Sequence, residues 1–466
     1  MDSIPAARLV SCESNATPGR WRVSRLVFEV PINYADERSE SIRLFARSVL
    51  RDERPIVRPH DQTEFDQVPY LVFLQGGPGF GCPDPQSISS LTNYVLNRGY
   101  QLLLLDYRGT GLSTPVNARH LRSLGSPQDQ ANYLKFFRAD NIVRDCEAVR
   151  KCLTENYAEG RKMWSLLGQS YGGFVSLTYL SKYPHGLREV FLTGGLAPIK
   201  RTAEEVYRAT YKKAIERNEA YYRKFPMDVA RIRKILNYIQ KREGGISLPA
   251  GGLLTVQRFL TLGMAFGFHG GFDTVNSTIF RMSSDLDQFG FFTRATLRAV
   301  EEDTPFDSNP IYAILHESVY CTKKGEASNW AAARVGAELP LFGWTKDEDN
   351  LLPVTPPFFS GEMIFPFHFE THPELKEMRE AANILASFDG WDELYNEEQL
   401  RVNVVPVYAA SYVDDIYVDF EFARETAKIV RKIKVYETNV LYHNALKAKT
   451  EEVLDHLFAL RDDSLD

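Results

Sequence analysis

Three short and almost wholly apolar segments, each running into a turn with glycines, constrain the fold of this chain most. They are PYLVFLQGGPG at 69–79, YQLLLLDYRGTG at 100–111 and WSLLGQSYGG at 164–173. A strand without alternating polarity is buried on both faces, as in a parallel sheet that helices cover. Helical patterns follow the second and third segments, over about 138–156 and 172–182. This alternation predicts an α/β fold with a mostly parallel central sheet flanked by helices.

The alternation stops after about residue 200 and resumes near residue 400. The interval holds segments with helical periodicity and many aromatic residues, beginning with TAEEVYRATYKKAIERNEAYYRKFP. After it, VNVVPVYAA and KVYETN are predicted strands, and FEFARETAKIVRK and EEVLDHLFALRD are predicted helices. The chain therefore divides into an α/β domain over 1–200 and 400–466 and a mainly helical cap domain over 201–399. The 29 Phe and 23 Tyr, frequent in segments such as FGFHGGF, FGFF and PPFF, are expected to line the pocket between them.

Charge and cysteine usage exclude several classes of protein. The chain has 55 basic and 61 acidic residues and no Lys/Arg-rich run, so neither a nucleic-acid nor a membrane partner is expected. Its N-terminal stretch lacks the apolar core of a signal peptide, and no window approaches 18 uninterrupted apolar residues. The five cysteines are scattered and form no CxxC pair, which indicates reduced thiols in the cytoplasm and no metal site.

The segment Gly168-Gln169-Ser170-Tyr171-Gly172 matches the pattern G-x-S-x-G between a predicted strand and a predicted helix. A nucleophilic serine on such a turn presents its hydroxyl above the sheet, and the glycines tolerate close packing. The helix that starts at about Tyr171 directs backbone N–H groups towards a developing oxyanion. Ser170 is therefore the candidate nucleophile, and a buried serine in an ordinary β–α turn is the structural alternative.

A serine nucleophile needs a base, and in α/β-hydrolases the chain order is serine, acid, histidine. His456 lies within a predicted helix, whereas His443 directly follows the strand KVYETN, where the base belongs. His443 is therefore the candidate base. Asp414 and Asp415 both follow VVPVYAA, and spacing alone does not choose between them. Asp419 lies further along, where an aspartate often caps a helix.

The loop Gln75–Gly79 follows the first apolar strand and is rich in glycine. Glycines let the backbone pass close to a reacting carbonyl, so the N–H of Gly77 is expected to form the oxyanion hole together with that of Tyr171. Asp106 and Arg108 are expected to be a buried pair that shapes the next loop. Neither G-x-G-x-x-G nor G-x-x-x-x-G-K-[ST] is present, so no nucleotide site is expected.

Together these residues resemble the prolyl aminopeptidase (proline iminopeptidase) family of α/β-hydrolase serine peptidases. That family carries an HGGPG loop, a DQRGxGxS segment, a GxSxGG elbow, a GRYD-type acid and a late histidine. This chain has QGGPG, DYRGTGLS, GQSYGG, YVDDIYVD and YHNAL in the same order. It departs from the family at Gln75, which replaces the usual histidine, and at Asp419, which stands where the family often has proline.

The resemblance implies an α/β-hydrolase fold with a cap inserted before the last strands and no cofactor. It implies a peptide substrate with a free N-terminus, from which an N-terminal residue, proline, is released. Matching the acid segment implies that Asp415 is the acid, and family members bind the substrate amine through cap carboxylates. Here Glu362 in SGEMIFPF is the first candidate for that role and Glu317 in LHESVY the second.

Two other functions fit parts of the pattern. A cofactor-free esterase or amidase acting on a small molecule would use the same three residues, and a hydrolase-like binding protein would have lost its activity. An epoxide hydrolase or dehalogenase is disfavoured because position 170 is serine, whereas those enzymes use an aspartate as nucleophile.

Overall fold

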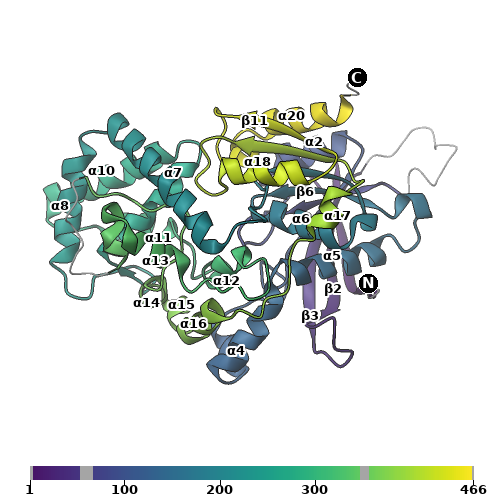
Figure 1. Ribbon diagram of the computed structural model, residues 1–466, viewed down its shortest axis with the longest axis horizontal. Helices are drawn as coiled ribbons and strands as arrows, with labels where there is room; N and C mark the ends of the chain where they lie inside the picture. The colour runs from purple at the N-terminus through teal and green to yellow at the C-terminus, as the bar shows by residue number, and fades with distance from the viewer. Residues whose placement is uncertain (1–3, 53–66, 347–355, 464–466) are drawn as a thin grey trace.

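The computed structural model describes residues 4–52, 67–346 and 356–463 (Figure 1). Within these residues, one nine-stranded sheet forms the centre of the molecule, in the order β1-β2-β3-β5-β4-β6-β7-β10-β11. The three N-terminal strands are antiparallel, and the strands from β5 to β11 run parallel. The strands in sheet order are β1 (Arg8–Thr17), β2 (Trp21–Pro31), β3 (Ser41–Arg51), β5 (Gln101–Leu105), β4 (Tyr70–Leu74), β6 (Trp164–Gln169), β7 (Leu187–Thr193), β10 (Val407–Tyr412) and β11 (Ile433–Thr438). The predicted mostly parallel sheet is confirmed.

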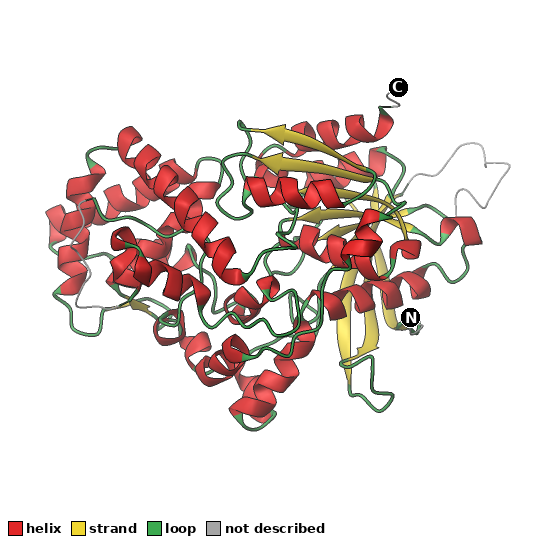
Figure 2. Cartoon of the chain, in the orientation of Figure 1, coloured by secondary structure: helices red, strands yellow, loops and turns green. Residues whose placement is uncertain are grey.

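Helices cover both faces of the sheet, which explains why its central strands are apolar throughout (Figure 2). In β4 the side chains alternate: Val72 and Leu74 belong to one buried cluster, and Leu71 and Phe73 belong to another. The first cluster includes residues of α5 (Ala139–Leu153), α6 (Tyr171–Lys182) and α18 (Phe420–Ile429). The second includes residues of α2 (Ser89–Asn97), α19 (Ala445–Ala448) and α20 (Thr450–Asp462).

The chain leaves the sheet after β7 and returns to it at β10, which pairs with β7 in parallel. The long interval is mainly helical and lies beside the sheet, on the left of Figure 1. Its first helix begins with a capping box in which the side chains of Thr202 and Glu205 bond to each other's backbone N–H. Its helices are α7 (Ala203–Lys224), α8 (Asp228–Gln240), α9 (Val256–Leu260), α10 (Gly271–Phe289), α11 (Arg294–Glu302), α12 (Pro310–Leu315), α13 (Ala331–Glu338), α14 (His368–Thr371), α15 (Pro373–Lys376), α16 (Arg379–Ser387) and α17 (Glu397–Arg401).

Some elements differ from the sequence-based expectations. The strand β1 was not expected, because its residues are exposed along almost its whole length and show no apolar alternation. Two short helices, α3 (Ala118–Ser123) and α4 (Pro127–Leu134), precede α5, and two short strands, β8 (Ile246–Ser247) and β9 (Leu253–Leu254), pair within the helical interval. Among the described residues, no helix is both long and apolar enough to cross a lipid bilayer.

The aromatic residues of the interval mostly pack among themselves. Phe266 stacks on Tyr221 with ring centroids 4.8 Å apart, and both contact Phe359. Phe289 and Phe291, by contrast, are 53% and 54% exposed. Most of these aromatic residues therefore build the interior of the helical interval or face solvent, whereas Phe268 of FGFHGGF stacks on Tyr417.

The expected Asp106–Arg108 pair is also wrong, although both side chains are buried. Asp106 accepts hydrogen bonds from the backbone N–H groups of Cys82 and Leu112, at 2.6 and 2.8 Å. Arg108 instead makes a bidentate ion pair with Asp145 of α5, with N···O distances of 2.7 and 2.6 Å. Arg108 thus ties the loop after β5 to the helix that covers the sheet.

The Arg108–Asp145 pair generates a stability prediction. Replacing Asp145 with Ala leaves the Arg108 guanidinium buried without a countercharge, so the free energy of unfolding should fall by about 3–5 kcal/mol. Urea denaturation measures this loss. The matched control is Glu302→Ala in the exposed Arg298–Glu302 pair, which should leave the free energy of unfolding almost unchanged because solvent screens this pair. Equal losses for the two variants would contradict the structural role of the buried pair.

Candidate active site

Ser170 occupies a sharp turn between β6 and α6. Its φ and ψ are 55° and −122°, a region that residues other than glycine rarely adopt. The backbone N–H of Ser170 donates to the carbonyl of Thr193 at 3.0 Å, and its carbonyl accepts from the N–H of Gly173 at 2.7 Å. A strained residue held in this way is typical of functional sites.

The glycines around the turn have no space for a side chain. A Cβ atom on Gly172 would lie 1.9 Å from the carbonyl oxygen of Leu74, at the end of β4. A Cβ atom on Gly173 would lie 2.3 Å from the carbonyl oxygen of Gly195. The start of α6 therefore packs backbone against backbone on its neighbours, which fixes the height of Ser170 above the sheet.

Three side chains from distant parts of the chain meet at this turn. The Nε2 atom of His443 lies 2.8 Å from the Oγ of Ser170, and its Nδ1 atom lies 2.7 Å from the Oδ2 of Asp415. A carboxylate only accepts hydrogen bonds, so the Nδ1 atom carries the proton and Nε2 of the neutral ring accepts from the serine hydroxyl. The arrangement can therefore take up a proton from Ser170 through His443.

The environment of His443 favours the protonated ring. Burial by itself lowers the pKa of His443, but the charge of Asp415, its hydrogen bond and the charge of Glu362 outweigh burial and raise that pKa above 6.5. The Oδ1 atom of Asp415 accepts from the backbone N–H groups of Tyr417 and Val418 at 2.8 and 3.2 Å. These bonds hold the carboxylate so that Oδ2 faces the imidazole.

The other aspartates of this segment lie elsewhere. The side chain of Asp414 is 38% exposed and its Oδ1 atom lies 3.9 Å from the Nζ of Lys213. Asp419 caps α18 by accepting from the backbone N–H of Phe422 at 3.0 Å, as its position in the sequence predicted. Of the three carboxylates, the structure thus brings Asp415 to His443.

The QGGPG loop passes directly beside the turn. A Cβ atom on Gly76 would lie 3.0 Å from the Cβ of Ser170, and one on Gly79 would lie 2.6 Å from the backbone nitrogen of Tyr312. Gly77 has a φ of 134°, which favours glycine. Tyr171 is the first residue of α6, so its N–H lies at the helix N-terminus. The loop therefore contacts both the turn and α12 of the helical interval.

Glu362 lies close to the same histidine. Its carboxyl is buried, and Oε1 accepts a hydrogen bond from the Oη of Tyr312 at 2.5 Å. The pKa of Glu362 is raised to about 7: burial raises it most and the charge of Asp415 adds to this, whereas the charge of His443 and the Tyr312 bond oppose the rise. Burial and then the charge of Glu362 raise the pKa of Tyr312, Tyr320 and Tyr417. Glu362 is thus a buried carboxyl among tyrosines beside the imidazole.

Glu317 has a different environment. Its two carboxyl oxygens accept from the backbone N–H groups of Ala331 and Ala332, at 3.0 and 2.9 Å. These N–H groups belong to the first turn of α13, where a negative charge complements the helix dipole. Burial, opposed by these hydrogen bonds, raises the pKa of Glu317 to about 7. Both carboxyl oxygens of Glu317 are therefore used to cap the N-terminus of α13.

Two tyrosines of the site were missed by the sequence analysis. Tyr312 donates to Glu362, and the ring of Tyr417 stacks on the imidazole of His443 with centroids 4.3 Å apart and planes 10° apart. Tyr417 follows Asp415 by two residues in YVDDIYVD, so its place beside the acid was a usable signal. No sequence signal indicated Tyr312, because its hydrogen-bond partner Glu362 lies 50 residues further along the chain.

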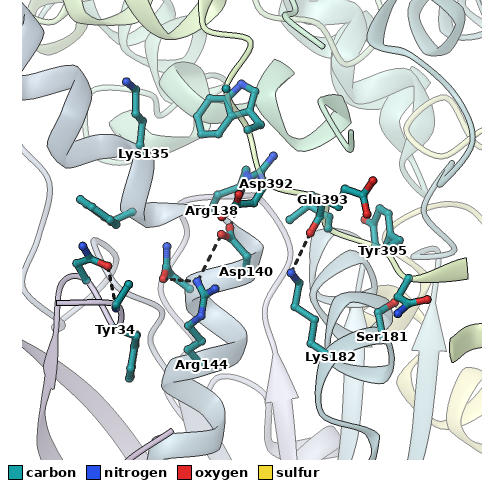
Figure 3. A pocket seen from close by; sticks show the side chains of 18 of the residues that line it. Tyr34, Lys135, Arg138, Asp140, Arg144, Ser181, Lys182, Asp392, Glu393 and Tyr395 are labelled. Atoms are coloured by element: carbon teal, nitrogen blue, oxygen red, sulfur yellow. Dashed lines mark hydrogen bonds and ion pairs between the residues drawn. The ribbon is translucent and has the colours of Figure 1, made fainter. Parts of the chain in front are cut away.

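A separate cavity of about 700 Å³ lies between the sheet domain and residues 388–396, which lead back from the helical interval (Figure 3). Two of its cations are bonded to that returning segment: Arg138 donates to the carbonyl of Asp392 at 2.5 Å, and Lys182 to that of Glu393 at 2.8 Å. Ser170, Asp415 and His443 are not among its lining residues. Within the described ranges, no group of three or more His, Cys, Asp or Glu could hold a metal ion.

Comparisons with known proteins show the family to which the chain belongs. A model of the alpha/beta hydrolase fold matches residues 69–235. Proline iminopeptidase aneH of Aspergillus aculeatus is 39% identical over 464 residues, which cover 100% of this chain and 99% of that protein. Proline iminopeptidase of Aeromonas sobria is 41% identical over 437 residues, covering 94% and 96%. The crystal structure of proline iminopeptidase from Mycobacterium smegmatis has 12% identity and a TM-score of 0.42, covering 93% and 97%. The chain belongs to the proline iminopeptidase family of α/β-hydrolases.

Proposed function

We propose that this enzyme is a serine aminopeptidase that releases an N-terminal residue, proline, from peptides through Ser170, His443 and Asp415. The observation that carries the proposal is the unbroken hydrogen-bond chain from Ser170 through His443 to Asp415, at 2.8 and 2.7 Å. The chemistry needs a nucleophile, a base and a carboxylate that fixes the imidazole tautomer. Both full-length relatives carry the name proline iminopeptidase.

The reaction is acyl transfer to water. His443 takes the proton of Ser170 as the Oγ atom attacks the carbonyl carbon of the first peptide bond. The N–H groups of Gly77 and Tyr171 hold the oxyanion, and each such donor contributes roughly 100- to 1,000-fold in related enzymes. His443 then gives its proton to the leaving amine. Water activated by His443 hydrolyses the acyl-enzyme and restores Ser170.

Glu362 is the proposed recognition group for the substrate amine. Its carboxyl is the buried acid beside His443, and a substrate ammonium would stabilise its charged form, because an opposite charge lowers the pKa of a carboxyl. Glu317, the second candidate, already accepts two backbone hydrogen bonds at α13. We therefore assign amine binding to Glu362 and a structural role to Glu317.

We also propose that residues 201–399 form a cap domain on a catalytic domain made of residues 1–200 and 400–466. The support is that the chain leaves the sheet after Thr193 and returns at Val407, and that Glu362 comes from the interval between them. The cytoplasmic location and the absence of nucleic-acid and membrane partners stay predictions, which cell fractionation tests. The five cysteines are free thiols.

A panel of aminoacyl-naphthylamides and simple acetyl esters tests the function. We expect release from prolyl-naphthylamide and little hydrolysis of acetyl esters, with Ser170 labelled by a fluorophosphonate. Hydrolysis of acetyl esters without release of proline would identify an esterase instead. Failure of the fluorophosphonate to label Ser170 would favour a binding protein.

The proposed acid generates a pH prediction. Asp415→Asn should lower kcat by about 1,000- to 10,000-fold, because the amide no longer fixes the imidazole tautomer. His443 must be neutral to accept a proton, so activity is lost as pH falls through its pKa. Since that pKa is raised above 6.5, the acidic limb of kcat/KM should lie above pH 6.5 in the wild type and move lower in the variant.

The control for this variant is Asp414→Asn, which should keep the kcat and the pH profile of the wild type. The assignment of Asp415 is wrong if Asp414→Asn is the inactive variant and Asp415→Asn the active one.

Amine recognition gives a further prediction. Glu362→Gln should raise KM for prolyl-naphthylamide by about 10- to 100-fold, the range expected for loss of one charged hydrogen bond. KM for an acetyl ester, which has no amine, should stay constant, whereas the acidic limb of its pH profile should move lower because the charge of Glu362 no longer raises the pKa of His443. In the control, Glu317→Gln should lower the melting temperature and leave KM unchanged. Unchanged KM in Glu362→Gln would rule out its proposed role.

A further inference from the structure

A short segment of the helical interval, Met264–His269, bonds to the loop that carries His443. The carbonyl of Gly267 accepts from the backbone N–H of His443 at 3.2 Å. The Nε2 atom of His269 accepts from the backbone N–H of Tyr442 at 3.1 Å, and the backbone N–H of His269 donates to the Oδ1 of Asn444 at 2.8 Å. Three consecutive residues around the proposed base are therefore bonded to Gly267 and His269.

The same segment also holds the ring that covers the imidazole. The Oη of Tyr417 donates to the carbonyl of Met264 at 2.5 Å, and Phe268 stacks on the Tyr417 ring with centroids 5.1 Å and planes 11° apart. Tyr417 in turn stacks on His443. A Cβ atom on Gly267 would lie 2.5 Å from the Tyr417 ring, so the segment and the ring are in tight contact.

The segment is itself fixed from helix α7. The guanidinium of Arg217 donates twice to the carbonyl of Phe266, at 3.1 and 3.0 Å, and lies 5.0 Å from the ring centroid of Tyr442. The contacts therefore run without a break from α7 through Met264–His269 to the histidine loop.

We propose that Met264–His269 and Tyr417 position His443, so that the helical interval is part of the catalytic machinery and not only a cover over the substrate. The hydrogen bond to Asp415 fixes one ring nitrogen but leaves the plane of the imidazole free to tilt about it. The stacked Tyr417 ring and the bonds to Gly267 and His269 remove that freedom and keep Nε2 directed at Ser170. An error of about 1 Å at such an atom costs roughly 100-fold in rate. This inference rests on the proposed catalytic role of His443.

Paired variants of His269 in the full-length chain test the inference. His269→Phe keeps an aromatic ring beside Tyr442 but has no acceptor, so kcat for prolyl-naphthylamide should fall by about 10- to 100-fold with KM within twofold. His269→Gln offers an oxygen acceptor to the same N–H and should retain most of kcat. The rate at which a small fluorophosphonate labels Ser170 should fall in parallel with kcat, because this reagent does not use the amine site.

Tyr417→Phe provides an independent variant, since it keeps the stacked ring and removes only the bond to Met264. Its kcat should fall severalfold at unchanged KM. The control is His456→Phe in α20, because His456 stacks on Tyr436 of β11 and has no contact with this loop among its described interactions. Melting temperatures identify any variant that fails to fold.

The outcomes distinguish the proposed function from the positioning role. Full activity in Ser170→Ala would overturn the proposed function itself. If Ser170→Ala is inactive while His269→Phe and Tyr417→Phe keep the kcat and labelling rate of the wild type, the positioning role is wrong. If His269→Phe does not fold, the kcat and labelling rate of Tyr417→Phe decide in the same way.

Discussion

The left-handed backbone of Ser170 is the constraint on which the rest of the site depends. A residue with a side chain adopts a φ of 55° only where its surroundings hold it there, and here they are almost entirely backbone atoms. A Cβ atom on Gly172 would lie 1.9 Å from the carbonyl oxygen of Leu74, and one on Gly195 would lie 2.7 Å from that of Ser170. Any side chain at these glycines would lift the turn from the sheet. The position of the hydroxyl is thus set by the packing of the sheet itself.

Two buried carboxyls, those of Asp415 and Glu362, influence the charge of the His443 imidazole, and their environments differ. Asp415 accepts two backbone N–H bonds and the Nδ1–H of His443, so its negative charge is well compensated. Glu362 has one tyrosine hydroxyl as its described hydrogen-bond partner, and burial raises its pKa to about 7. A cation entering beside Glu362 would supply the missing compensation. In the proposed function, the negative charge of Glu362 therefore both binds the substrate amine and stabilises the protonated His443.

The sequence predicted the elements whose signal is local. Ser170 and His443 could be found because the glycines of the turn and the end of a strand are visible in the printed sequence. Asp414 and Asp415 could not be separated from spacing, since the direction of adjacent side chains in a turn depends on the backbone bonds that Asp415 accepts. Glu317 was a candidate for substrate binding. Its contact with a helix end could not be predicted, because that helix end lies 14 and 15 residues further along the chain. Met264–His269 contacts residues 442–444, which lie about 175 residues further along the chain. No local sequence pattern predicts such contacts.

Ser170 and His443 are 273 residues apart in the chain, so they leave the ribosome at different times during synthesis. At roughly 5–20 residues per second, a ribosome needs on the order of tens of seconds to pass from one to the other. The nucleophile leaves the ribosome before the helical interval, and the imidazole follows that interval. A nascent chain therefore carries the serine without its base while these 273 residues are made. In the proposed function, Ser170 has neither acid nor base until β10 and β11 have joined the sheet, so a partly synthesised chain would have no hydrolase activity.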